Sequence, residues 1–211
     1  MRSGHALHNF FSSAIINSTL STFAIGNVAL FGYANRFAAG ASAIAVGPHS
    51  NIFHAQIAKA WADHTPASVI ESARNYLAHI APIYVLTVIA VWLTLSPMIG
   101  FITNTNTNMP LDALTKTFLL LSVWYGVIQP ESVFVAIIIV AHRAITLLLV
   151  NGFFAIVFYA ISHAPLALHE YALLPVAAIL AQLISLALFA LTANRIFRQH
   201  FGAGQTNAVR L

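Results

Sequence analysis

The residues of this chain that could do chemistry are a few polar side chains inside long apolar runs. Glu131 follows Gln129-Pro130 within one run, and Arg36 lies in a short break between two others. A carboxyl group inside a membrane is a candidate for proton or cation coupling. The alternative is a neutral, hydrogen-bonded glutamic acid near a backbone carbonyl that the neighbouring proline leaves without its helical N–H partner. The planar guanidinium of Arg36 suits phosphate, which makes it a candidate anion contact; the alternative is an interfacial arginine that snorkels to water.

A second polar feature is a strip near the N-terminus. Asn9, Ser13, Asn17 and Ser21 recur every four residues, so on a helix they lie on one slowly turning face. Asparagine is unfavourable against lipid, and the strip should therefore face other helices or a water-filled cavity. It predicts either interhelical hydrogen bonds or the lining of a path for a hydrophilic solute.

Other kinds of chemistry have little support in the sequence. Of the ten histidines, His49 and His54 are five residues apart and fall on different helix faces. The chain has no cysteine, no nucleotide-binding glycine loop and no Ser/His/Asp arrangement. We predict no metal site, no cofactor, no nucleic-acid partner and no enzymatic activity.

The elements that must position these residues are membrane-spanning helices. Only 7% of the 211 residues are charged, 59% are hydrophobic, and the mean hydropathy is +0.82. Helices satisfy their own backbone in lipid, so we predict an all-α polytopic membrane protein with about six transmembrane helices in residues 1–196 and a cytoplasmic tail over 197–211. The predicted spans are residues 10–33, 37–60, 76–102, 114–141, 145–161 and 172–193.

Prolines and a polar stretch mark the expected irregularities. Gly47-Pro48 predicts a broken or kinked second span, Pro130 an interruption of the fourth, and Ser96-Pro97 the approach to the end of the third. Residues 61–75 form a polar stretch between the second and third spans.

The distribution of cations predicts the orientation. With the N-terminus in the cytoplasm, six spans leave only Arg36 and Lys116 outside. Because cytoplasmic loops carry the excess of Lys and Arg, this bias favours six spans with both termini in the cytoplasm. The cations assigned to the cytoplasmic side are Arg2, Lys59, Arg74, Arg143, Arg195, Arg198 and Arg210.

The first two predicted spans resemble a known family of transporters. The stretch from Gly26 to Arg36, the small-residue helix to Gly47, and Gln56-Ile57-Ala58-Lys59 are similar to the seventh and eighth helices of lipid II and polysaccharide flippases. These flippases belong to the multidrug/oligosaccharidyl-lipid/polysaccharide exporter (MOP) superfamily. Further along the chain, the resemblance consists of span order and of Ala141-His142-Arg143 before a span that contains Asn151.

The resemblance implies a function and a partner. Such flippases have two six-helix lobes around a central cavity and move a polyprenyl-diphosphate-linked sugar, such as lipid II, across the bacterial inner membrane. An arginine at the position of Arg36 contacts the diphosphate, so Arg36, Tyr33 and Asn35 are expected to bind substrate, together with Asn17, Ser13 and Ser21 of the strip. The expected partners are a lipid-linked oligosaccharide or lipid II, membrane lipids, and a second six-helix lobe, either a homodimer mate or a separate chain.

The chain also departs from the family. Only the second lobe is represented, and the fifth span is preceded by Ala144-Ile145-Thr146 in place of a threonine-proline signature. Two alternatives stay open beside the flippase lobe. One is a multidrug or cation antiporter lobe in which Glu131 carries the coupling, and the other is a membrane protein that does not transport.

Overall fold

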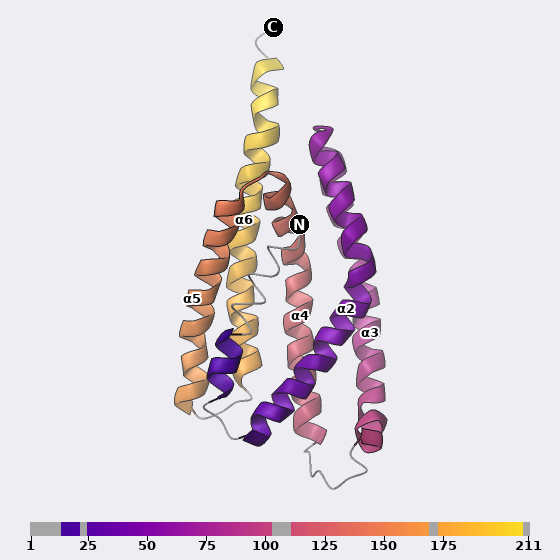
Figure 1. Cartoon of the computed structure of the whole chain (residues 1–211). Coiled ribbons are helices and arrows are strands. Elements are labelled where there is room, and N and C mark those ends of the chain that lie inside the picture. The colour runs from indigo at the N-terminus through magenta and orange to yellow at the C-terminus, as the bar shows by residue number, and fades with distance from the viewer. Residues whose placement is uncertain (1–13, 22–24, 103–110, 169–172, 209–211) are drawn as a thin grey trace.

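The computed structural model describes residues 14–21, 25–102, 111–168 and 173–208, and within them every regular element is helical (Figure 1). Residues 14–20 form a short helix, and the long helices follow in chain order. These are α2 (Ile25–Ala62), α3 (Pro66–Ile102), α4 (Leu111–Val140), α5 (Ala144–Leu168) and α6 (Leu174–Ala208).

Helix α2 corrects the predicted boundary between the first two spans. It runs without interruption through residues 34–36, so the expected break at Arg36 is wrong. The segment around Arg36 contains no proline, and one polar residue does not end a helix whose backbone hydrogen bonds are intact. Pro48 lies inside α2, so of the two alternatives for Gly47-Pro48 the structure has a continuous helix rather than a broken one.

Three other helices also differ from the predicted spans. Helix α3 begins at Pro66, inside the stretch expected to be polar loop, and continues through Pro97 to Ile102. Proline is favourable in the first turn of a helix, where its missing N–H has no partner to lose. Helix α4 passes through Pro130, and α6 continues past residue 193 to Ala208, so the expected tail begins as helix.

The turns α2–α3 and α4–α5 have the same backbone structure. The Thr65 N–H donates to the Ala60 carbonyl at 3.1 Å, and the Arg143 N–H donates to the Ile138 carbonyl, also at 3.1 Å. His64 and His142 precede these donors with φ of 51° and 55°, the left-handed conformation that closes a Schellman motif. Two histidines therefore occupy positions where glycine is the usual residue.

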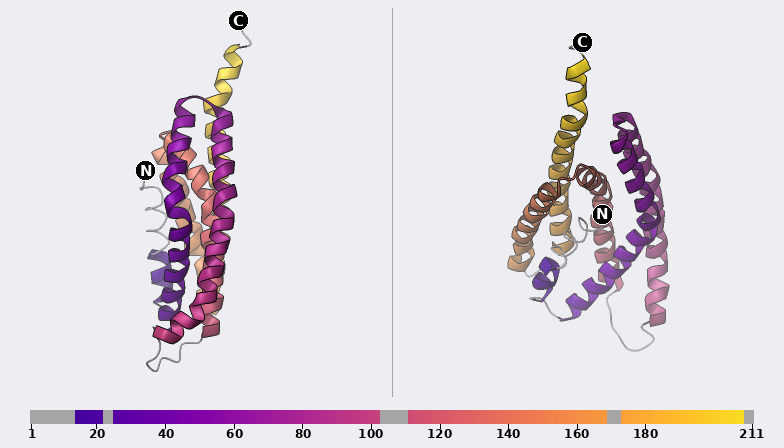
Figure 2. Two further views of the ribbon diagram at one scale, coloured as in Figure 1. Left: turned by 90° about the vertical axis from the view of Figure 1, so that its right-hand side faces the viewer. Right: turned by 45° about the horizontal axis from the view of Figure 1, so that its top comes forward.

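Helix α4 is the centre of the bundle. It packs against α2, α3, α5 and α6, while α2 also packs on α3, and α5 on α6 (Figures 1 and 2). The turns α2–α3 and α4–α5 lie at the same end of the bundle as the C-terminal part of α6, which projects beyond it. We call this the turn end.

Two hydrophobic clusters fill the bundle, one toward each end. The first includes Phe118, Trp124 and Phe158, and the second, toward the turn end, includes Val133, Phe189 and Ile196. Between them lie the polar side chains that we call the polar layer. Its members are Ser42 of α2, Gln129, Glu131 and Ser132 of α4, Asn151 of α5, and Gln182 and Ser185 of α6.

Four helices are long and apolar enough to cross a membrane. They are α3 over Pro66–Leu95, α4 over Leu111–Val140, α5 over Ala144–His163 and α6 over Leu174–Gly202. Their outward surfaces carry large hydrophobic side chains such as Ile156, which is 69% exposed, as expected of helices that face lipid. The chain is therefore an all-helical protein with four candidate membrane-spanning helices among its described residues.

Candidate functional site

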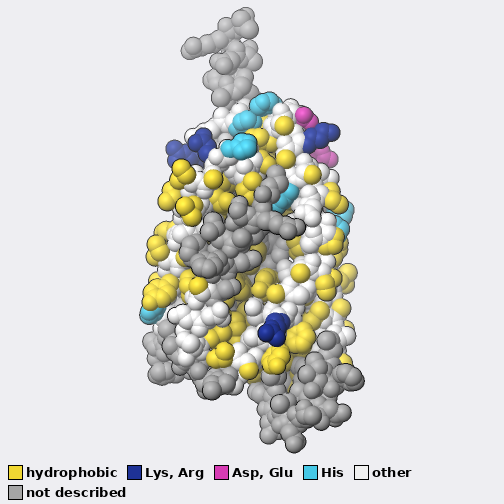
Figure 3. Space-filling model, in the orientation of Figure 1, with side chains coloured by type: hydrophobic (Ala, Val, Ile, Leu, Met, Phe, Trp, Pro, Cys, Tyr) yellow, Lys and Arg dark blue, Asp and Glu magenta, His cyan; other side chains and the backbone are white. Residues whose placement is uncertain are grey.

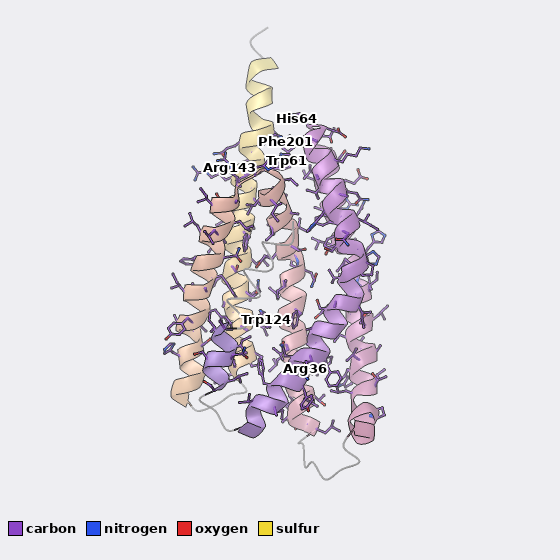
Figure 4. All side chains as sticks on the ribbon, viewed as in Figure 1. Arg36, Trp61, His64, Trp124, Arg143 and Phe201 are labelled. Carbon is purple, nitrogen blue, oxygen red and sulfur yellow. The ribbon has the colours of Figure 1, made fainter. Side chains whose placement is uncertain are left out.

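Arg36 is exposed on α2, next to a residue that contacts α4. Its neighbour Asn35 accepts a hydrogen bond from the Tyr125 hydroxyl at 3.1 Å, which sets the level of α2 against α4. Tyr125 lies midway between Leu111 and Val140, the ends of a candidate membrane span. Helix α2 continues through Arg36, and Figure 4 labels Arg36 in the lower part of the bundle, toward the end opposite the turn end. Its position at a membrane boundary stays a prediction.

The face of α2 around Arg36 is open. Tyr33, one turn away, is 45% exposed, whereas Ala34 and Ala38 on the opposite face are fully buried. A Cβ atom added at Gly40 or at Gly47 would meet nothing within 4 Å, so no described part of the chain covers these positions. In Figure 3, cationic side chains gather toward the turn end, and one stands apart low on the visible face, where Figure 4 labels Arg36.

Glu131 belongs to a network that joins α4 to α6. Its carboxyl group is 2% exposed and accepts a hydrogen bond from the Gln182 side-chain amide. The Gln182 carbonyl oxygen accepts a hydrogen bond from the Trp124 indole N–H at 3.1 Å. Trp124 and Glu131 are two turns apart on one face of α4, so a single glutamine bridges both. Ser185, one turn after Gln182, lies beside the same carboxyl group.

The polar layer continues from this network to both sides. On the α2 side, the Gln129 amide donates to the Ser42 hydroxyl oxygen at 3.3 Å. On the α5 side, the amide nitrogen of Asn151 donates to the Leu147 carbonyl at 2.8 Å. The other amide atom, Asn151 Oδ1, is buried and lacks a hydrogen-bond partner among the described residues. An unsatisfied buried polar atom costs about 1–3 kcal/mol, so the α5 side is the least satisfied part of the layer.

The predicted site residues other than Glu131 fall into three groups. Arg36, Tyr33 and Asn35 lie together on α2, and Asn35 is engaged by Tyr125. Asn17 and Ser21 of the predicted strip are exposed, and the Ser21 hydroxyl donates to the Ser18 carbonyl at 2.7 Å. Asn9 and Ser13 lie outside the described residues.

The network also contains a residue that the sequence analysis did not single out. Gln182 is fully buried and has polar partners at two positions of α4. A signal was present, because Gln182 is the one amide side chain between Leu174 and Ala193. Its partners, however, are more than fifty residues away in sequence, and pairing over such a distance leaves no local pattern.

A polar groove of about 580 Å³ lies between α2 and α3 near the turn end. Lys59, Asp63 and Glu71 line it, with His49 and His79 deeper along the two helices. No group of three histidine, aspartate or glutamate side chains in the described part of the chain is placed to hold a metal ion. The groove therefore has mixed charge and no evident ligand preference.

Comparison with known proteins identifies no relative. No family model, curated protein or solved structure matches the chain. The function must therefore be inferred from the residues and from their positions in the bundle.

Proposed function

We propose that this chain is one lobe of a flippase-type exporter that moves a polyprenyl-diphosphate-linked saccharide across the bacterial inner membrane. The observation that carries the proposal is that Arg36 is a cation exposed on the open face of α2, in a bundle with four candidate membrane-spanning helices. The resemblance of residues 26–36 to lipid II and polysaccharide flippases supports the same conclusion.

The physical argument begins with the unfavourable energy of a charge in lipid. An arginine at the centre of a membrane helix costs about 2.5–3.5 kcal/mol on insertion scales, and such residues face a protein interior or a water-filled cavity. Arg36 is exposed in the single chain, so lipid would have to surround it unless something else covers the open face of α2. A second six-helix lobe, from a homodimer mate or a separate chain, would enclose that face as one wall of a cavity.

Within such a cavity Arg36 would bind the diphosphate of the substrate. The guanidinium donates two parallel hydrogen bonds to phosphate oxygens, and its charge is permanent. Tyr33 lies one turn away on the same exposed face and offers a hydroxyl group beside it. The lipid tail stays in the bilayer, and no covalent bond forms or breaks. Both termini would lie in the cytoplasm, with the turn end on that side.

Binding of a polyprenyl-diphosphate-linked saccharide to Arg36 variants tests the proposal. Arg36→Ala should lower the affinity at least tenfold. Arg36→Lys should lower it less, because lysine keeps the positive charge but cannot donate two parallel hydrogen bonds to one phosphate. Arg74→Ala is the matched control, since it removes an exposed cation on α3 far from Arg36, and it should change affinity less than about twofold. Unchanged binding by Arg36→Ala would remove Arg36 from the site.

The second lobe can be tested separately by native mass spectrometry of the protein in lipid nanodiscs. The proposal predicts a dimer or a complex with another membrane chain. A stable monomer would leave the Arg36 face without a cover and would contradict transport by this chain.

An antiporter lobe is the second candidate, favoured by the burial of Glu131 at the centre of the bundle. In that mechanism the carboxyl group would exchange a proton or cation during transport. Its bond to Gln182 and its place in the α4–α6 interface fit a bridging role equally well, so we rank this function second.

A further inference from the structure

Two basic pockets lie side by side around the C-terminal part of α6, at the turn end. One, of about 350 Å³, lies between α6, the end of α2 and the α4–α5 turn, and its polar lining is His142, Arg143, Gln199 and His200. The other, of about 340 Å³, is on α6 itself, and its lining includes Arg195 and Arg198 with Asn194 and Gln199. Because Gln199 lines both, the two pockets form one continuous surface, which we call the α6 collar.

The charge of the collar has one sign. Among the described residues that line it there are three arginines and no acid, and the other polar side chains are amides and imidazoles that can donate hydrogen bonds. Asp63 and Glu71, the acids of this end, line the α2–α3 groove instead. In Figure 3 the acids lie at the upper right together with one group of cations, while the cations at the upper left and the histidines at the upper centre have no acid beside them on this face. A surface made of donors and positive charge suits phosphate oxygens.

Part of the collar is held rigidly before any ligand binds. The His200 ring stacks between Trp61, at a centroid distance of 4.3 Å, and His64, at 4.8 Å, which ties α6 to the α2–α3 turn (Figure 4). His200 Nε2 is buried and lacks a hydrogen-bond partner among the described residues. The backbone of Arg143 is held by its N–H in the Schellman turn, and its side chain is exposed. Because this backbone and the His200 ring are already held, less entropy is lost on binding, which favours a specific site over a diffuse charged surface.

The position of the collar indicates which phosphate it would bind. Arg143 immediately precedes the candidate span Ala144–His163, and Arg195 and Arg198 lie in the last part of the span Leu174–Gly202. The pocket walls also include the apolar side chains of Val140, Leu191 and Ile196. Charged donors next to apolar walls at the end of a span match a phospholipid, whose phosphate and acyl chains meet at that level.

We propose that the α6 collar binds the phosphodiester of an anionic phospholipid in the leaflet at the turn end. This site is distinct from the Arg36 face and does not depend on the proposed transport function. The bound lipid would lie against Gln199, which both pockets share, with Arg143 in one pocket and Arg195 and Arg198 in the other.

The test is native mass spectrometry of the full chain in a neutral detergent, titrated with phosphatidylglycerol. Wild-type protein should bind phosphatidylglycerol at least tenfold more tightly than phosphatidylcholine. Arg143→Gln and Arg198→Gln should each weaken phosphatidylglycerol binding about tenfold or more, as expected for the loss of a charge-assisted hydrogen bond. Arg74→Gln removes the same charge from α3 outside both pockets and should weaken it less than about twofold.

Three results would overturn the proposal. Equal losses for Arg74→Gln and the two collar variants would show general attraction to the basic end. Equal binding of phosphatidylcholine would show that the anionic headgroup is not recognised. If soluble glycerol phosphate bound as tightly as phosphatidylglycerol, the collar would be a site for free phosphate rather than for lipid. Should Arg143→Gln fail to fold, Arg198→Gln on the helix surface keeps the test intact.

Discussion

Replacing Gln182 should loosen the bundle at the junction of α4 and α6. Gln182 is fully buried and makes two interhelical hydrogen bonds, one from the Trp124 indole and one to the Glu131 carboxyl group. Gln182→Leu keeps the apolar stem and a similar volume but removes both bonds. Interhelical hydrogen bonds in membranes contribute about 0.6 kcal/mol on average and up to about 1.7 kcal/mol, so two of them predict a loss of roughly 1–3 kcal/mol.

The assay is reversible unfolding of the purified protein by a denaturing detergent, followed by tryptophan fluorescence. Gln56→Leu is the matched control, because it makes the same substitution at an exposed position of α2, and its free energy of unfolding should change by less than about 0.5 kcal/mol. A double-mutant cycle of Gln182→Leu with Trp124→Phe isolates the indole bond. If Gln182→Leu were no less stable than Gln56→Leu, the bridge between α4 and α6 would not hold the bundle together.

Three further predictions concern the turns, the core and the carboxyl group. His142→Gly should be more stable than His142→Ala by about 1 kcal/mol in the same unfolding assay, since only glycine adopts the left-handed φ of 55° without a steric penalty; equal stability would contradict this. Phe158→Ala should cost about 3–5 kcal/mol because Phe158 is fully buried, whereas Phe153→Ala, at 47% exposure, should cost much less; similar losses would refute the packing. Glu131→Gln should leave binding of a lipid-linked diphosphate within about twofold, since an amide oxygen can still accept from Gln182; abolition of ion-driven efflux would favour the antiporter.

The sequence predicts the class of fold and much of the helix order, because the apolar runs are long and the charges are few. The fourth helix, expected at 114–141, is Leu111–Val140 in the structure. The error at residues 34–36 arose from treating a polar residue as the end of a helix. Helix ends depend on backbone hydrogen bonds and caps, and the closing signals at the α2–α3 turn are a histidine and a proline rather than a change in polarity.

The candidate site was predictable only in part. Arg36 and Glu131 are conspicuous in the sequence because each is a charge among apolar neighbours. The contact of Asn35, the neighbour of Arg36, with α4 was not predictable, since it is a hydrogen bond to Tyr125, which lies far away in the chain. The bridge through Gln182 was missed for the same reason.

The central claim is that Arg36 faces a water-filled cavity at membrane depth, and cysteine accessibility tests it directly. The chain contains no cysteine, so a single Arg36→Cys variant in native membranes can be treated with a negatively charged thiosulfonate reagent that reacts only in water. Ile156→Cys is the lipid-facing control on α5, within the candidate span Ala144–His163. The account predicts that the Arg36→Cys variant is labelled and that the Ile156→Cys variant is not labelled. If neither variant were labelled, Arg36 would face lipid, and the proposed cavity would be contradicted.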